Sequence, residues 1–559
     1  MNPAGCVRWL TLALFAATQP AWPAPAAGPT AEPVLNFEVL RFDTLIGLSR
    51  EVLVTPGAWR EVARLNRLPD PNRILPGQLL RIPTRLLRVT PLSATLAGSS
   101  GDVQIGTAAA VEGSPLAAGQ TVQTGSTGSA VVEFADGSRL RLPPSTLAHV
   151  LTSQSLGARP AGAELPAGSA LGGWFSGAMR VLRGSVEVFA TKILRAKPFE
   201  VMTPTAVVGV RGTGFRVSYE EGDGVRGTTR VEVVDGQVRF DAGGRERGVD
   251  VPAGFGSTAD AAGGALRVVK LLDAPDLSSV PPRFERPIVR FSMPAETVPL
   301  RMQVAGDAAF DRIVVDQRVE PGGEVRIAGL MDATWHLRSR RIDTDGLEGL
   351  DAKGRFVLKA RPEPPAYLTP RSDAKQAVGP IEFAWAPNVD AARARLQVAE
   401  DAAFTRVLQD RIELTGATLR ADIASPGQYF WRLASVRANG DAGPFGDAQR
   451  FELRPLPEPP TGGLSADGRA LVFTWGGRGQ DRQQVQLASD PAFAQIVEQA
   501  ELSSPTWTLL ASGRSGRLFF RYRSVEPDGF VSPYSSTLMI DVPRDWSGLW
   551  LLLPVLLLF

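Results

Sequence analysis

The chain has 559 residues, of which 44% are apolar and 21% charged, so it can form several folded domains with hydrophobic cores. Its 60 Lys and Arg residues nearly balance its 58 Asp and Glu residues, which argues against a dedicated nucleic-acid-binding protein. Cys6 is the only cysteine, and His149 and His336 are the only histidines. A Cys/His zinc site therefore cannot be assembled, and a Ser-His-Asp triad would depend on one lone histidine. We expect a protein without enzymatic activity, metal or cofactor.

The first residues predict an exported protein. Arg8 supplies a positive charge, residues 9–17 form a short apolar stretch, and residues 24–26 (APA) form a small-x-small cleavage site. We expect a signal peptide over residues 1–26 and a location in the periplasm or cell envelope. Because Cys6 precedes the apolar stretch, it cannot be a lipoprotein acceptor cysteine, and the mature chain has no thiol.

Residues 35–83 predict a small β-α-α-β unit. A short strand at 37–41 is followed by Asp43, which stands where a helix N-cap would, and Thr55-Pro56 repeats such a start signal before a second helix. An apolar run at 79–82 then returns as a strand.

Three segments of this unit make it resemble a LysM module: residues 42–45 (FDTL), 65–66 (LN) and 74–83 (ILPGQLLRIP). Members of that family bind glycans containing N-acetylglucosamine, such as peptidoglycan, in a shallow groove between the first strand–helix loop and the second helix–strand loop. The resemblance implies these groove residues: Asp43, Thr44, Leu45, Ile46, Asn72, Ile74, Leu75, Pro76 and Gly77. The family usually has glycine where this chain has Phe42, whose ring would crowd the groove or add a stacking face. A spacer module that binds no glycan is the alternative.

Residues 100–258 predict an all-β domain. Apolar residues alternate with polar ones on both sides of two tight-turn signals, Asp136-Gly137 and Asp235-Gly236, which is typical of hairpins with one buried and one solvated face. Residues 153–173 are rich in glycine, alanine and serine and predict a mobile surface loop.

Four motifs in this domain resemble the FecR domain in the family's order: residues 119–125 (GQTVQTG), 134–138 (FADGS), 204–215 (PTAVVGVRGTGF) and 231–238 (VEVVDGQV). FecR domains are all-β periplasmic modules. In the namesake the domain relays a signal to a sigma factor, a role we do not expect here because a signal peptide and a LysM-like unit come first. The glycines at 209–214 precede a strand and predict a bulge or close turn, with Arg211 as a candidate contact for an anionic partner.

Three repeats follow, at 280–362, 363–455 and 456–543. Residues 302–310 recur as 396–404 and as 485–493, at offsets of 94 and 89 residues. Each repeat carries an aromatic residue on an early strand: Phe291, Trp385 and Trp475. We expect the tryptophans in the core, and a carbohydrate-stacking role is the alternative. A period near 90 made of strands without cysteine predicts β-sandwiches, and the units resemble fibronectin type III modules.

Residues 546–559 are apolar throughout, and as a helix would span about 20 Å against a hydrocarbon core of about 30 Å. Shallow membrane contact, docking on a hydrophobic partner and a hidden core segment are three open interpretations.

The sequence as a whole predicts a mostly β, multidomain protein: a βααβ LysM module, an all-β FecR domain and three fibronectin type III- or Ig-like β-sandwiches. Its predicted function is that of a periplasmic scaffold or sensor that binds peptidoglycan and an unidentified envelope protein. A peptidoglycan-remodelling accessory and a surface- or secretion-associated structural protein anchored by the apolar tail are the alternatives.

Overall fold

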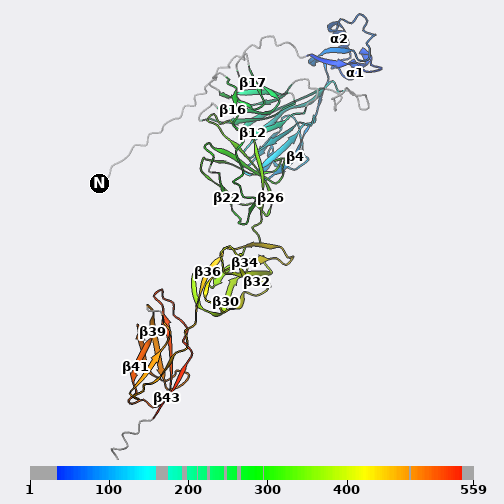
Figure 1. Ribbon diagram of the computed structural model, residues 1–559. Coiled ribbons are helices and arrows are strands. Elements are labelled where there is room, and N and C mark those ends of the chain that lie inside the picture. The colour runs from blue at the N-terminus through cyan, green and yellow to red at the C-terminus, as the bar shows by residue number, and fades with distance from the viewer. Residues whose placement is uncertain are drawn as a thin grey trace, which may run out of the picture. The chain divides into compact units, whose positions relative to one another are not determined.

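The computed structural model describes residues 34–158, 174–191, 198–210, 212–222, 227–243, 248–260, 266–293, 295–477 and 480–543 (Figure 1). The predicted signal peptide, the apolar tail, Arg211 and most of the 153–173 insertion lie outside these residues. The chain is mostly β, as predicted, and divides into two compact units. The first contains residues up to 277 together with 294–323 and 336–354, and the second contains 278–293, 324–335 and the residues from 355 onward. No helix in the described ranges is long and apolar enough to cross a membrane.

The N-terminal module has the predicted β-α-α-β order: Val34–Glu38 (β1), Leu45–Glu51 (α1), Trp59–Leu65 (α2) and Leu79–Pro83 (β2). The two strands pair antiparallel, with Phe37 opposite Leu80, and both side chains are buried against the helices. Apolar positions on the two helices complete this small core, and Leu156 and Trp174 from later in the chain pack against it, with the rings of Phe37 and Trp174 5.3 Å apart.

Both predicted helix starts were wrong. Thr44, not Asp43, caps α1, because its Oγ1 accepts a hydrogen bond from the Gly47 N–H at 3.0 Å. The second helix begins at Trp59, three residues beyond Pro56. The buried Ser49 hydroxyl donates to the carbonyls of Thr55 and Pro56, and the Ala58 N–H also donates to Thr55, so this segment forms a turn before the helix.

A 3₁₀ turn at Thr84–Leu86 leads into a closed β-barrel. The FecR-like residues form part of the wall of this barrel. Its strands are Val89–Pro91 (β3), Ala94–Ser100 (β4), Val103–Ile105 (β5), Ala108–Ala109 (β6), Pro115–Leu116 (β7), Thr121–Thr124 (β8), Ser129–Glu133 (β9), Arg139–Leu142 (β10), Leu147–Leu156 (β11), Trp174–Phe189 (β12), Phe199–Met202 (β13), Ala206–Val210 (β14), Gly214–Glu220 (β15), Thr228–Asp235 (β16), Gln237–Ala242 (β17), Val249–Pro252 (β18), Phe255–Asp260 (β19) and Val269–Lys270 (β20). The long β12 joins two sheets, because its first half pairs with β11 and β13 and its second half with β10 and β15.

Only one of the two predicted hairpins is present. The turn at Asp136-Gly137 connects β9 and β10, which pair with Glu133 opposite Arg139, and Gly137 takes the positive φ of 79° that this turn requires. Asp235-Gly236 also makes a turn, but β16 pairs with β15 and β19 whereas β17 pairs with β14 and β18. The second turn therefore passes the chain from one sheet to the other, and valines on both sides of it face the same core.

The first repeat contributes strands to both units. Its strands are Arg283–Phe284 (β21), Val289–Ser292 (β22), Leu300–Ala305 (β23), Ile313–Val319 (β24), Glu324–Ile327 (β25), Ala333–Arg341 (β26) and Ala352–Leu358 (β27). In the first unit, β23 pairs antiparallel with β24 and with residues 336–341 of β26. In the second unit, β22 pairs with β25, and β21 pairs in parallel with the end of β27.

The second and third repeats each form two sheets, in agreement with the predicted β-sandwiches. The second repeat contains Ala366–Thr369 (β28), Ala374–Ala377 (β29), Gly379–Ala386 (β30), Arg393–Ala399 (β31), Val407–Leu414 (β32), Thr418–Ile423 (β33), Gly427–Val436 (β34), Ala442–Phe445 (β35) and Gln449–Arg454 (β36). The third contains Thr461–Leu464 (β37), Ala470–Thr474 (β38), Arg482–Ala488 (β39), Ile496–Leu502 (β40), Thr506–Leu510 (β41), Gly516–Val525 (β42) and Leu538–Val542 (β43). Trp385 and Trp475 are buried, as predicted, and so is Phe291.

Candidate binding sites

The residues predicted to bind glycan lie on two loops that are held side by side, except for Leu45 and Ile46, which begin α1 directly after the first loop. The Gly77 N–H donates to the Val39 carbonyl at 2.7 Å, and the Val39 N–H donates to the Gln78 carbonyl at 2.9 Å. These two bonds connect the loop after β1 to the loop before β2. The structure therefore brings the two predicted halves of the groove together.

The predicted groove residues do not all face solvent. Leu45 is only 2% exposed and belongs to the core of the module, and Thr44 is engaged as the cap of α1. Asp43 accepts a hydrogen bond from the Leu40 N–H at 2.7 Å and so fixes the first loop. Ile46 and Leu75 are exposed apolar residues. The remaining predicted residues lie on the second loop, exposed except for the half-buried Ile74: Asn72, Ile74, Pro76 and Gly77.

Phe42 occupies a backbone conformation that explains the family's glycine. Its φ is +73°, in the left-handed region where a side chain costs about 1–2 kcal/mol and glycine costs nothing. Its ring is 87% exposed, and the Arg41 guanidinium lies over it at 5.1 Å. The ring therefore projects from the first loop into solvent.

A second candidate site, which sequence reasoning missed, lies in the first unit around Glu187 of β12. This carboxylate accepts hydrogen bonds from both terminal nitrogens of Arg338, at 3.0 and 2.8 Å, and from Arg340 at 2.5 Å. All three side chains are buried. Glu187 lies between the buried Val186 and Val188, and β26, 151 residues away in sequence, covers it.

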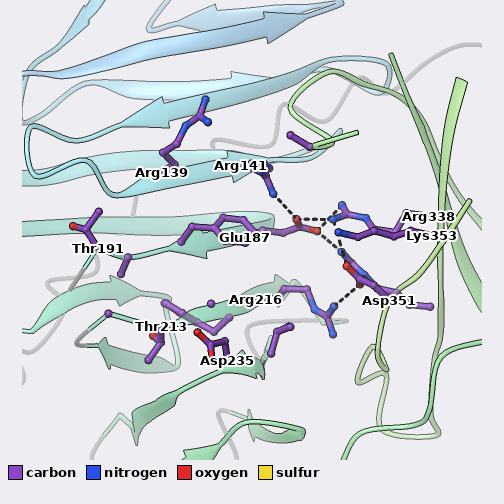
Figure 2. Close-up of a pocket in the computed structure, with 18 of the residues that line it drawn as sticks. Arg139, Arg141, Glu187, Thr191, Thr213, Arg216, Asp235, Arg338, Asp351 and Lys353 are labelled. Atoms are coloured by element: carbon purple, nitrogen blue, oxygen red, sulfur yellow. Dashed lines mark hydrogen bonds and ion pairs between the residues drawn. The ribbon is translucent and has the colours of Figure 1, made fainter. Parts of the chain in front are cut away.

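Arg216 of β15 extends this buried network. It donates to Asp351 at 3.1 Å and to the carbonyls of Glu348 and Gly349 at 2.7 Å each. Arg340 donates to the same Asp351 at 2.5 Å and to the Glu348 carboxylate at 2.7 Å, so the two arginines share Asp351 as an acceptor. Figure 2 shows Glu187 between Arg141 and Arg338, and Arg216 reaching Asp351. Because each buried charge has hydrogen-bonded partners, the network offsets the cost of removing it from water.

A loop of the first repeat adds contacts beside this network. Asp311 accepts hydrogen bonds from Arg139 and Arg141 of β10, at 3.2 and 2.5 Å. The Ile313 N–H donates to the Ser129 hydroxyl at 2.9 Å, and the Ile313 side chain is buried. Residues 300–323 and 336–351 therefore contact the barrel through both polar and apolar groups.

A cavity of about 600 Å³ opens beside the network (Figure 2). Six basic and three acidic side chains line it: Arg139, Arg141, Arg216, Arg338, Arg340, Lys353, Glu187, Asp235 and Asp351. The glycine run also contributes, since Gly212 has a φ of +75° and a bulge at Gly214 begins β15. A strand and not a helix follows the glycines, as predicted, so they form a turn and not a phosphate-binding helix start.

The network holds its carboxyl groups in different ionisation states. Burial opposes the ionisation of Glu187, but Arg338 and Arg340 outweigh it and keep its pKa well below the usual range. Burial raises the pKa of Glu232 on β16 to about 7. The nearby carboxylate of Glu348 adds to this rise, whereas Arg216, 3.5 Å away, opposes it. Glu348 remains ionised, because Arg301, Arg340 and Arg216 lower its pKa against the effect of burial.

Comparisons with known proteins support part of this picture. The model of the FecR protein family matches residues 120–239, inside the domain predicted at 100–258. No curated protein matches the chain. Similar solved structures include the chicken CNTN1 FN1-FN3 domains, with 13% identity and a TM-score of 0.20, covering 49% of this chain and 97% of that chain. The Clostridium thermocellum CbhA fibronectin(III)-like modules have 11% identity and a TM-score of 0.20, covering 32% and 93%.

The strain at Phe42 gives a first prediction. Phe42→Gly should stabilise the N-terminal module by about 1 kcal/mol relative to Phe42→Ala, because both remove the ring and only glycine accepts the positive φ freely. Hydrogen exchange of the β1 and β2 amides in the full chain measures the difference. Equal protection in the two variants would show that the backbone at this position is not strained.

The Glu187 network gives a second prediction. Glu187→Gln should destabilise the first unit by about 3–5 kcal/mol, because it leaves two buried guanidinium groups without their shared carboxylate. Denaturant-dependent hydrogen exchange at β12 and β26 reports the loss. The matched control is Glu220→Gln, whose exposed ion pair with Arg230 contributes about 0–1 kcal/mol. A cost for Glu187→Gln no larger than this control contradicts the network's role.

Glu232 gives a prediction about pH. Its pKa is about 7 in the folded chain against an ordinary value of 4.5, so the folded state binds more protons between these values. Its contribution to the free energy of unfolding is therefore complete below pH 4.5 and is lost as pH rises through 7. Glu187, with a lowered pKa, loses its contribution only on acidification, below this window. The Tm of the first unit should fall between pH 5 and 8, and Glu232→Gln should reduce that fall whereas Glu220→Gln should not. Parallel pH profiles for Glu232→Gln and wild type would exclude Glu232 as the titrating group.

Proposed function

We propose that this chain is a non-enzymatic cell-envelope protein that binds peptidoglycan through residues 35–83. In this proposal the barrel and the sandwiches present β-surfaces to a protein partner, and the chain acts as a scaffold or sensor. The observation that carries the proposal is the pair of backbone hydrogen bonds from Val39 to Gly77 and Gln78, which hold the two predicted groove loops together.

The chemistry of these loops suits an N-acetylglucosamine unit. Turn backbone groups can hydrogen-bond the acetamido group, while the exposed side chains of Ile46 and Leu75 can cover its methyl group. The exposed ring of Phe42 adds an apolar face that can stack on a sugar. One shallow groove of this kind gives modest affinity, because little surface is buried on binding.

The location in the envelope is supported by the match of residues 120–239 to the FecR family, whose domains are periplasmic modules. A sensor or regulatory role follows from the same resemblance. The three sandwiches add β-surfaces that suit protein contacts, and the buried contact of the first repeat with the barrel is an example within the chain itself.

Sedimentation of the full mature chain with purified peptidoglycan sacculi tests the proposal. We expect Ile46→Glu combined with Leu75→Glu to weaken co-sedimentation at least tenfold, because charges replace two exposed apolar groups on the groove loops. Both side chains are exposed, so the fold should tolerate the change, whereas a substitution of Thr44 would also remove the cap of α1. Val54→Glu, an exposed apolar position outside both loops, is the matched control.

Equal co-sedimentation of the double variant and the wild type would remove the groove from the proposal. Release of soluble glycan fragments in the wild-type samples would replace the binding role by an enzymatic one.

A further inference from the structure

The three repeats share a cluster of one arginine, one glutamine and one phenylalanine at equivalent positions, which we call the arginine face. Its members are Arg338, Gln303 and Phe310 in the first repeat; Arg432, Gln397 and Phe404 in the second; and Arg521, Gln486 and Phe493 in the third. The positions are related by the same offsets, 94 and 89 residues, that define the repeats. The cluster is therefore part of the repeat itself.

The geometry of the arginine face is the same each time. The arginine Nε donates to the glutamine Oε1 at 3.0, 2.9 and 3.0 Å in the three repeats. The guanidinium carbon lies 4.4, 3.9 and 3.9 Å from the centre of the phenylalanine ring. Each phenylalanine has a positive φ, between 57° and 62°, and an aspartate three residues before it accepts hydrogen bonds from the backbone of the same loop. These hydrogen bonds fix the loop so that its phenylalanine ring packs against the guanidinium group of the arginine on the neighbouring strand.

In the first repeat this face is occupied by the barrel. Gln303 accepts a hydrogen bond from Nε of Arg338. The two terminal nitrogens of Arg338, Nη1 and Nη2, form the other edge of the guanidinium and bind the Glu187 carboxylate. Ile313, three residues after Phe310, is 1% exposed, and its N–H donates to Ser129. One carboxylate and one apolar contact thus define how a β-surface occupies an arginine face.

In the second and third repeats the equivalent positions are open. Val407 and Ile496, which correspond to Ile313, are 40% and 39% exposed. Arg432 and Arg521 each bond their glutamine through Nε and Nη2, and within the described parts of the chain no carboxylate pairs with either arginine. Both faces therefore keep the charge and the apolar residue without an occupant.

The surroundings hold these two guanidinium groups in place without an ion pair in the described parts of the chain, and Asp410 and Glu285 act on Arg432 only through longer-range attraction. The position of Asp351 is taken by Phe445 in the second repeat and by Tyr534 in the third, and these rings lie 4.2 and 4.0 Å from the guanidinium carbons. Each arginine is thus fixed between two aromatic rings, which stabilise a cation without supplying an opposite charge. The third repeat also has Arg523 at the position of Arg340, so it retains both arginines that bind Glu187 in the first.

The strands beside the open faces can take a further strand. β32 and β40 are the edge strands of their sheets, and they carry the exposed Val407 and Ile496 at their first residues. An edge strand offers unpaired backbone N–H and C=O groups to another sheet. A small free anion would satisfy the arginine but would leave this apolar and hydrogen-bonding edge uncovered.

We propose that the arginine faces of the second and third repeats are docking sites for a partner protein whose β-sheet presents a glutamate or aspartate, as β12 presents Glu187 to the first repeat. The inference rests on the partner-presenting role in the proposed function, and it is independent of glycan binding by residues 35–83.

A designed pair of hairpin peptides tests this inference on the full mature chain. One strand of the backbone-cyclised hairpin reads Ser185 to Phe189 (SVEVF), and in its twin the glutamate is replaced by glutamine. We expect the glutamate hairpin to bind at least tenfold more tightly than the twin, because a two-nitrogen guanidinium–carboxylate contact is lost with glutamine. Arg521→Gln should weaken binding more than Arg432→Gln, since Arg523 adds a second cation to the third face.

The double variant Arg432→Gln/Arg521→Gln should abolish the preference for glutamate, and Arg420→Gln, an exposed arginine on β33 of the other sheet, should preserve it. Equal binding of the two hairpins to the wild type, or no binding of either, would overturn the inference. A glutamate preference that survives in the double variant would overturn it as well. If that variant unfolds, the Nε–Hε NMR signals of Arg432 and Arg521 decide, because only the glutamate hairpin should shift them. Sacculus co-sedimentation in the same samples reports on the N-terminal module separately.

Discussion

The carboxylate of Glu187, shared by the guanidinium groups of Arg338 and Arg340, is the interaction on which the first unit depends. Taking three charges out of water costs more free energy than one ion pair recovers, so the arrangement needs further hydrogen bonds to the buried guanidinium groups. Gln303 accepts such bonds from Arg338, and Glu348 and Asp351 accept them from Arg340. These bonds are directional, and they fix residues 300–323 and 336–351 on the barrel in one arrangement, which apolar contacts alone would not specify.

Local patterns in the sequence were sufficient to predict a mostly β chain. Strand alternation and glycine turns predicted an all-β domain, although not its closure into a barrel, and the repeat period predicted the sandwiches, in which Trp385 and Trp475 are buried as expected. The errors concern features that the local pattern leaves open. A turn such as Asp235-Gly236 has the same sequence whether its strands pair or enter different sheets. Asp43 and Thr44 are adjacent cap residues, and only the hydrogen bond to Gly47 distinguishes them.

The Glu187 network could not be predicted in this way. Alternation of apolar and polar residues indicates a strand with one face buried and the other in water, so it places a polar residue such as Glu187 in water. On β12 both faces are covered: Val186 and Val188 face the barrel core, and Glu187 is covered by a strand from another part of the chain. A non-local signal was nevertheless present. Arg338, Arg432 and Arg521 recur in phase, as do the three glutamines that bind them, and comparison of the repeats with one another would have revealed a shared polar site. For the groove, the family resemblance located both loops, but it could not show that Leu45 points into the core.

Occupation of the first arginine face by the barrel also bears on self-association. A chain that carried an open Glu187 surface and open arginine faces would be complementary to its own copies, head to tail, and such heterologous contacts propagate into open filaments unless they close into a ring. In this chain the Glu187 surface is already bound by Arg338. A tethered group acts at an effective concentration on the order of millimolar, which a second copy at cellular concentration cannot match. The intramolecular contact thus prevents head-to-tail polymerisation. It covers the Glu187 surface and leaves the arginine faces of the second and third repeats available to a different protein.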